Sequence, residues 1–250
     1  MKNVLDIHNN IPAHHTGWHI HDRQTMTAYA ITCTLLSVLF LLSMILPGDT
    51  RNFLIEEGGI VESASVFAYF LGAMLIIYNH KTDHLKYFFV IIIFFMLREL
   101  DFDKRFTTMG IFKIRFFTGS SVPFMEKVIG AMVILLLVYV FLSVLYQHSK
   151  DFFMGLKKGS AVSFGTLLTI TLLLAARITD GLYRKLLKML GIALSKQMYG
   201  HISALEEISE MAIPTVIFIT LNAYFKAIKI SQLPAPDDKS ALRFTAAGKL

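Results

Sequence analysis

The stretch Arg98-Glu-Leu-Asp-Phe-Asp-Lys-Arg105 decides how the chain folds, because its charges directly follow an apolar run, Tyr87–Leu97. A helix rises about 1.5 Å per residue, so this run reaches only about half of a hydrocarbon core of roughly 30 Å. A membrane-spanning helix must therefore continue through Arg98, Glu99 and Asp101. Charges at that depth are costly unless they face protein or water, which makes them candidates for a functional site.

The composition is that of a polytopic helical membrane protein. Of the 250 residues, 54% are hydrophobic and 17% are charged, whereas soluble domains carry about 25% charged residues. The apolar runs are long and do not alternate, which disfavours a β-barrel. Cys33 is the only cysteine, so an intramolecular disulfide and a cysteine-based metal site are excluded. The net charge of +6 is spread over short loops, which suits anionic lipid headgroups better than nucleic acid.

We predict an all-α membrane bundle of about six transmembrane helices. It forms one domain, 25–230, between a polar, histidine-rich tail, 1–24, and a polar tail, 231–250. The expected spans are 25–46, 59–78, 84–103, 124–147, 160–179 and 203–226.

Two further segments have the pattern of helices that lie along a membrane surface. Residues 182–196 place apolar side chains on one face and basic ones largely elsewhere, which predicts a basic amphipathic helix at the interface. Residues 106–117 either do the same or pack against the bundle.

Six spans put both termini on one side of the membrane. The lysines and arginines divide equally between the two sides, so the positive-inside rule alone does not set the orientation. Lys226 and Lys229 lie close to the last span and favour cytoplasmic termini. We expect a multi-pass protein of the inner (cytoplasmic) membrane with both termini in the cytoplasm.

Acidic residues gather at the span ends opposite the termini, and three hairpins would bring these ends to one face of the bundle. Arginines there would clamp a phosphate bidentately. One carboxylate would act as a general base, or several would hold a divalent cation, Mg²⁺, Mn²⁺ or Ca²⁺. The candidate catalytic acids are Glu62, Glu99, Asp101, Asp180, Glu207 and Glu210, and the candidate substrate-binding arginines are Arg98, Arg105, Arg177 and Arg184.

Spacing within the charged stretches is regular. Arg98, Asp101 and Arg105 stand at i, i+3 and i+7, which places them on one helical face. The same spacing recurs at the end of the fifth span, either as a trace of internal duplication or by chance. The recurring set is Arg177, Asp180 and Arg184.

Two helix faces carry stripes suited to close packing. In the second span, Ser65, Tyr69 and Ala73 continue the face of Glu62. In the fifth span, small residues repeat every fourth position and permit a close approach of helices. They are Ala161, Gly165 and Thr169.

Several functions remain open at this point. The first is a membrane enzyme or binding protein acting on a lipid or lipid-linked anionic substrate. The second is a small proton- or ion-coupled transporter, which the apolar terminal-side halves of the spans disfavour. The third is a structural or assembly subunit whose charged face binds another protein. A separate alternative is that Arg98 and Asp101 form only a structural ion pair at a helix end. No P-loop, GxGxxG, HExxH, GxSxG or CxxC motif is present to decide between them.

Overall fold

The protein is a multi-pass helical membrane protein, which confirms the predicted fold class. The computed structural model describes residues 16–47, 50, 59–80, 85–182, 185–186, 189 and 195–231. The principal helices in these ranges are α2 (Thr16–Ile45), α4 (Ile60–Tyr78), α5 (Lys86–Glu99), α6 (Phe102–Phe106), α7 (Ile114–Thr118), α8 (Phe124–Lys157), α9 (Ala161–Thr179) and α11 (Lys196–Ser231). Five of them, namely α2, α4, α8, α9 and α11, are long and apolar enough to cross a membrane.

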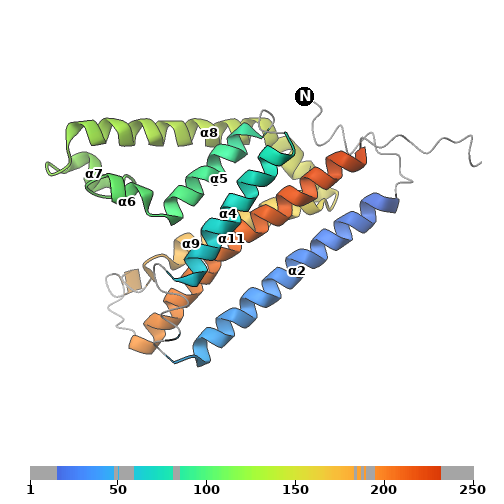
Figure 1. The fold of residues 1–250 in the computed structure, drawn as a ribbon, viewed down its shortest axis with the longest axis horizontal. Helices are drawn as coiled ribbons and strands as arrows, with labels where there is room; N and C mark the ends of the chain where they lie inside the picture. Colours follow the sequence, from blue (N-terminus) through green and yellow to red (C-terminus); the bar gives the residue numbers. More distant parts are fainter. Residues whose placement is uncertain are drawn as a thin grey trace, which may run out of the picture.

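Helix α11 lies at the centre of the bundle, in contact with α2, α4 and α9 (Figure 1). Helix α5 packs against α4, and α8 contacts α5 and α9. Helix α2 begins beside the end of α11 and finishes beside its start, so these two helices run in opposite directions (Figure 1). The described ends of the chain therefore lie at the same end of the bundle, which we call the terminal end; the other is the opposite end.

Three helices extend beyond the apolar runs that predicted them. Helix α2 begins at Thr16 within the expected polar tail, α8 continues to Lys157, and α11 covers Lys196–Ser231. Hydropathy marks the part of a helix that suits lipid, whereas backbone hydrogen bonding continues into polar sequence. The prediction located these helices correctly but made them too short, because it ended each helix where its apolar run ends.

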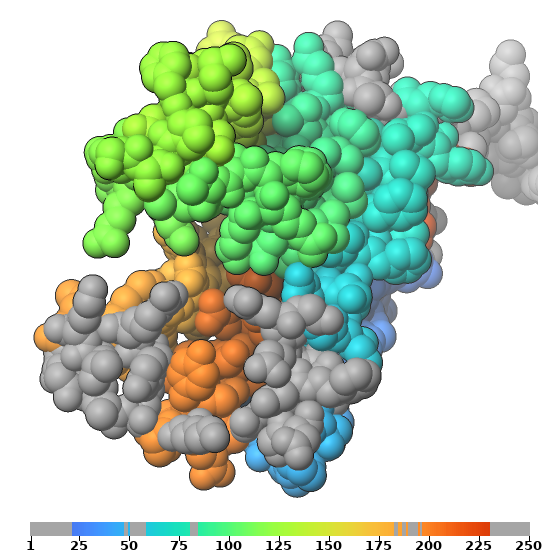
Figure 2. Space-filling model, turned by 60° about the vertical axis from the view of Figure 1, so that its left-hand side comes forward, coloured from blue at the N-terminus to red at the C-terminus, as the bar shows by residue number. Residues whose placement is uncertain are grey.

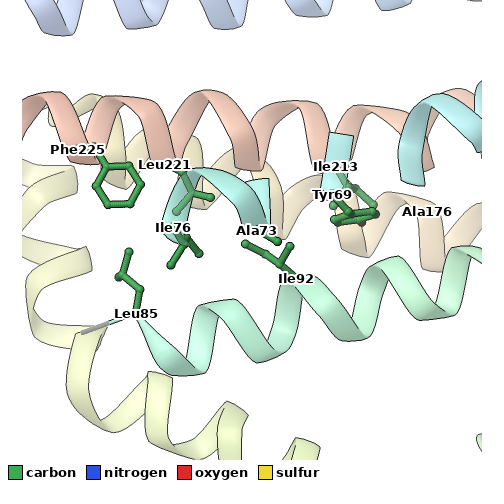
Figure 3. Close-up of a cluster of buried hydrophobic side chains, with 9 residues drawn as sticks. All are labelled: Tyr69, Ala73, Ile76, Leu85, Ile92, Ala176, Ile213, Leu221 and Phe225. Atoms are coloured by element: carbon green, nitrogen blue, oxygen red, sulfur yellow. The ribbon is translucent and has the colours of Figure 1, made fainter. Parts of the chain in front are cut away.

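The apolar core fills the bundle between α4, α5, α9 and α11 (Figure 3). Helix α4 sits between α5 and α11 and contributes Tyr69, Ala73 and Ile76, which are at most 2% exposed. The predicted stripe of α4 is confirmed, since Ser65 is also 1% exposed. The remaining members of the core are Leu85, Ile92, Ala176, Ile213, Leu221 and Phe225.

A second close contact joins α2, α9 and α11 near the terminal end. The hydroxyl of Tyr29 lies 2.9 Å from that of Thr220 and donates to the carbonyl of Ala161 at 3.3 Å. Gly165 leaves the space for both hydroxyl groups, because a Cβ built on it would collide with the Tyr29 and Thr220 oxygens. The predicted small-residue stripe of α9 is thus a packing surface.

The expected third span, 84–103, is shorter in the structure. Helix α5 has 14 residues and ends at Glu99, a length of about 21 Å. Asp101 then adopts a left-handed conformation with φ 49°, which Asp tolerates better than most residues. The prediction that Arg98, Asp101 and Arg105 share one helical face is therefore wrong, because the helix breaks between them.

Residues 102–123, which we call the lobe, form a compact connection between α5 and α8. Helices α6 and α7 are five residues each, so 106–117 is not a continuous interfacial helix. Ile111, Phe116 and Val122 form a small core of their own that packs on α8. The second predicted interfacial helix, 182–196, lies largely outside the described residues.

We predict that Gly165→Ala destabilises the bundle by roughly 1–3 kcal/mol, the usual cost of overpacking. The added methyl group must displace the Tyr29 and Thr220 hydroxyl groups. Thermal unfolding of the purified protein in detergent, followed by circular dichroism, measures the effect.

The matched control is Gly72→Ala, at a helical glycine of α4. There an added Cβ meets only ordinary contacts, at 3.7 Å from Leu221 and 4.0 Å from Ile92. We expect no loss of stability, or a gain of about 0.4–1 kcal/mol from reduced freedom of the unfolded chain. Equal loss in both variants would contradict the packing role of Gly165.

Candidate functional site

The candidate site lies at the opposite end of the bundle, where α4 begins, α5 ends and the first half of α11 passes. Val61 of α4 packs against Ala204 of α11, which brings Glu62 beside the acids of α11. Arg98, in the last turn of α5, donates a hydrogen bond of 2.8 Å from Nη2 to Glu210 Oε1 of α11. Its Nη1 lies 3.9 Å from the Glu99 carboxylate.

The acids and the arginine of this site differ sharply in exposure. The Glu99 side chain is 6% exposed and that of Glu210 is 16% exposed, whereas the Arg98 side chain is 45% exposed. The buried Glu99 carboxylate and the partly buried Glu210 carboxylate therefore hold the guanidinium from within, and its outer part remains accessible. Such a guanidinium can offer its free N–H directions to an oxyanion.

The carboxylates of the site act on one another electrostatically. Glu62 repels both Glu99 and Glu207, and Glu210 repels the same two. Arg98 pairs with Glu99 and Glu210. Like charges this close do not all ionise cheaply. The site therefore presents grouped carboxylates that can accept hydrogen bonds from a ligand.

Tyr69 is a site residue that the sequence-based selection did not include. It is 2% exposed and lies close enough to Arg98, Glu99 and Glu210 to interact with each electrostatically. The available signal was its position seven residues after Glu62, on the same face of α4. An aromatic residue at such a position is more often a core residue, which is why the pattern alone did not single it out.

The structure brings together five of the ten predicted site residues. They are Glu62, Arg98, Glu99, Glu207 and Glu210. Asp101 lies at the edge, where it acts on Glu99 and forms a 2.7 Å ion pair with Lys104.

The other predicted residues stand apart from this centre. Arg177 pairs with Asp180 at 2.6 Å, with side chains 80% and 37% exposed, and the expected approach of this pair to acids of α4 and α11 is not observed among the described residues. The two copies of the RxxDxxxR spacing thus have different partners, because α5 breaks at Asp101 whereas Arg177 and Asp180 share the end of α9. Arg105 is exposed on α6, and Arg184 lies outside the described residues.

The described residues do not fit the divalent cation that the acidic composition suggested. In the ranges that the structure covers, no three His, Cys, Asp or Glu side chains are placed to hold a metal ion. The acids come from three helices, and the Arg98 guanidinium lies between two of them. The roles proposed for the site residues do not require a metal ion.

The surface near this end of the bundle is hollowed. Figure 2 shows a recess between the green surface formed by α5 to α8 and the orange start of α11. The chain matches no family model, and neither a curated protein nor a solved structure is significantly similar to it. The basis for a functional proposal is therefore the site itself.

We predict that Arg98→Ala destabilises the protein by roughly 1–3 kcal/mol. Loss of a partner from a fully buried pair costs about 3–5 kcal/mol, and the half-exposed guanidinium reduces that cost. The substitution leaves the buried carboxylate of Glu99 and the partly buried carboxylate of Glu210 without this cation. Chemical denaturation in mixed micelles measures the difference.

Arg177→Ala is the matched control, because it removes an arginine from an exposed pair with Asp180. Exposed pairs contribute about 0–1 kcal/mol, so we expect a much smaller loss. Similar losses for the two variants would mean that the Arg98 pair is no more than a surface contact.

Proposed function

We propose that the protein binds and processes the headgroup of a lipid or lipid-linked anionic substrate at the opposite end of the bundle. The observation that carries this proposal is the half-exposed guanidinium of Arg98, held by the buried carboxylate of Glu99 and the partly buried carboxylate of Glu210. It stands at the end of a helix that is too short to cross a bilayer. Such a position suits a reactive group that meets lipid headgroups from within the bundle.

Each member of the site has a role in this proposal. Arg98 contacts the phosphate of the substrate, while Glu210 keeps the guanidinium oriented. Glu62 or Glu207 accepts a proton from a substrate hydroxyl or from water, as a general base. The closeness of Glu62 and Glu207 to the Arg98 centre favours this role, because a general base must lie near the substrate that the arginine holds.

A proton- or ion-coupled transporter is the second candidate, and the grouping of carboxylates from three helices is the observation that favours it. Transport requires polar groups along a path to the terminal end. Among the described residues, that part of the bundle is filled by the apolar core, with Ala73, Ile76 and Ile92 at most 3% exposed. A site open to one side is therefore the better supported function.

The orientation that agrees with this function places both termini in the cytoplasm and the site at the outer face of the inner membrane. We predict that a green fluorescent protein fused to the C-terminus fluoresces and that alkaline phosphatase fused there is inactive. Lys226 and Lys229, near the end of α11, motivate this orientation. An active phosphatase fusion with a dark fluorescent fusion would reverse it.

Bound lipid tests the proposed function directly. We predict that the purified protein retains a phosphorus-containing lipid that mass spectrometry identifies, and that Glu207→Gln lowers the retained amount at least fivefold. The amide keeps the shape of the side chain and removes its charge, so this variant should insert and unfold like the parent. Complementation of a deletion strain by Glu62→Gln and Glu207→Gln should fail in parallel.

Asp151→Asn is the control, because it removes an acid at the other end of α8. It should retain the lipid and complement the deletion. If the parent, Glu207→Gln and Asp151→Asn retain the same lipids in equal amounts, those lipids merely surround the bundle. Full complementation by both glutamate variants would then leave the charges with a structural role only.

A further inference from the structure

The lobe, residues 102–123, is fixed to the start of α8. The backbone N–H and the hydroxyl group of Thr108 donate to the Glu126 carboxylate, at 2.8 and 2.9 Å. Lys127 Nζ donates to the carbonyl oxygen of Gly119 at 2.7 Å. Phe116, which is fully buried, fills the space that Gly130 leaves open on α8. The lobe is thus a folded unit held against the first two turns of a membrane helix.

Chain continuity sets the depth of the lobe in the membrane. The helix before the lobe, α5, is about 21 Å long, which is less than the roughly 30 Å thickness of a hydrocarbon core. The lobe is followed at once by α8, whose first residues, Phe124 and Met125, are 77% and 71% exposed. A short α5 and an apolar start of α8 suit a lobe at the boundary between acyl chains and headgroups, on the side opposite the termini.

The outer surface of the lobe combines large apolar side chains with bases. Phe106, Phe112 and Ile114 are 68%, 57% and 80% exposed. Exposed bases stand beside them in the sequence, at Arg105, Lys113 and Arg115. Across 102–123 there are four bases and one acid, a net charge of +3. Figure 2 shows this green surface as one rim of the recess.

We propose that the lobe is a docking surface for anionic phospholipids. Phe106, Phe112 and Ile114 enter the acyl boundary, and Arg105, Lys113 and Arg115 contact headgroup phosphates. The combination of apolar and basic side chains at the interface is the physical basis of selective binding to anionic lipid. This inference does not depend on the proposed function, since the lobe binds lipid in this way even if the Arg98 centre is purely structural.

A partner protein is the competing occupant of this surface. It would require a lobe that stands in water, with three large apolar side chains solvated before the partner arrives. The short α5 and the immediate start of α8 argue against that position. The same experiment separates the two occupants, because a lobe in water does not meet acyl chains.

The test places a fluorescent probe on the lobe. Ile114→Trp in a Trp18→Phe background gives a protein whose one tryptophan reports on position 114. The full chain is reconstituted with brominated phosphatidylglycerol or brominated phosphatidylcholine, which quench tryptophan on contact. We expect quenching by both lipids, with an apparent affinity for phosphatidylglycerol at least threefold higher.

Variants assign the preference to the bases of the lobe. Arg105→Gln, Lys113→Gln and Arg115→Gln together should lower the phosphatidylglycerol preference to parity, while quenching by phosphatidylcholine persists. If the triple variant does not fold, two smaller variants replace it, Arg105→Gln alone and Lys113→Gln combined with Arg115→Gln. Each of the two should lose part of the preference for phosphatidylglycerol. The control removes three exposed bases from the terminal end, by Lys150→Gln, Lys157→Gln and Lys229→Gln, and should keep the full preference.

Three outcomes would overturn the proposal. If neither lipid quenches the tryptophan, the lobe lies in water or against a protein. Equal quenching by the two lipids in the probe protein would remove the role of the headgroup phosphate. A preference that survives in the triple variant, or that is lost in the control, would assign anionic lipid binding to other residues.

Discussion

The ion pair between Arg98 and Glu210 is the interaction on which the arrangement of the opposite end depends. It joins the end of α5 to the central helix α11. Along most of their length, these two helices are separated by α4. A charge inside a membrane protein must face protein, water or an opposite charge. That requirement holds α5 over the start of α4 and gathers Glu62, Glu99 and Glu207 around the pair.

The early end of α5 shapes what comes after it. An uninterrupted helix through Asp101 would carry Arg98, Asp101 and Arg105 along one face. The left-handed turn at Asp101 instead sends Lys104 and Arg105 away from the bundle. The chain can then form the lobe before α8 begins. A charged centre inside the bundle and a basic, aromatic surface outside it are therefore neighbours in sequence.

The two ends of the bundle are built from different chemistry. At the terminal end, packing depends on small residues and hydroxyl groups, as in the contact of Tyr29 with Thr220 beside Gly165. Between the ends, the apolar core around Ala73 and Ile76 separates the two faces. At the opposite end, packing depends on charge. This asymmetry is the reason that a one-sided site, open to headgroups, agrees with the molecule better than a path through it.

The sequence by itself determined the class of the protein, because apolar runs of about 20 residues have few other solutions than membrane helices. It also determined which side chains are costly in a membrane, and so pointed to Glu62, Arg98, Glu99, Glu207 and Glu210. Tertiary structure decided which of the predicted residues meet. Arg98 and Arg177 have the same local spacing, yet one pairs across helices with Glu210 and the other pairs within its own helix end with Asp180. Spacing describes one helix, whereas ion pairing in a bundle depends on which helices are neighbours and where each one ends.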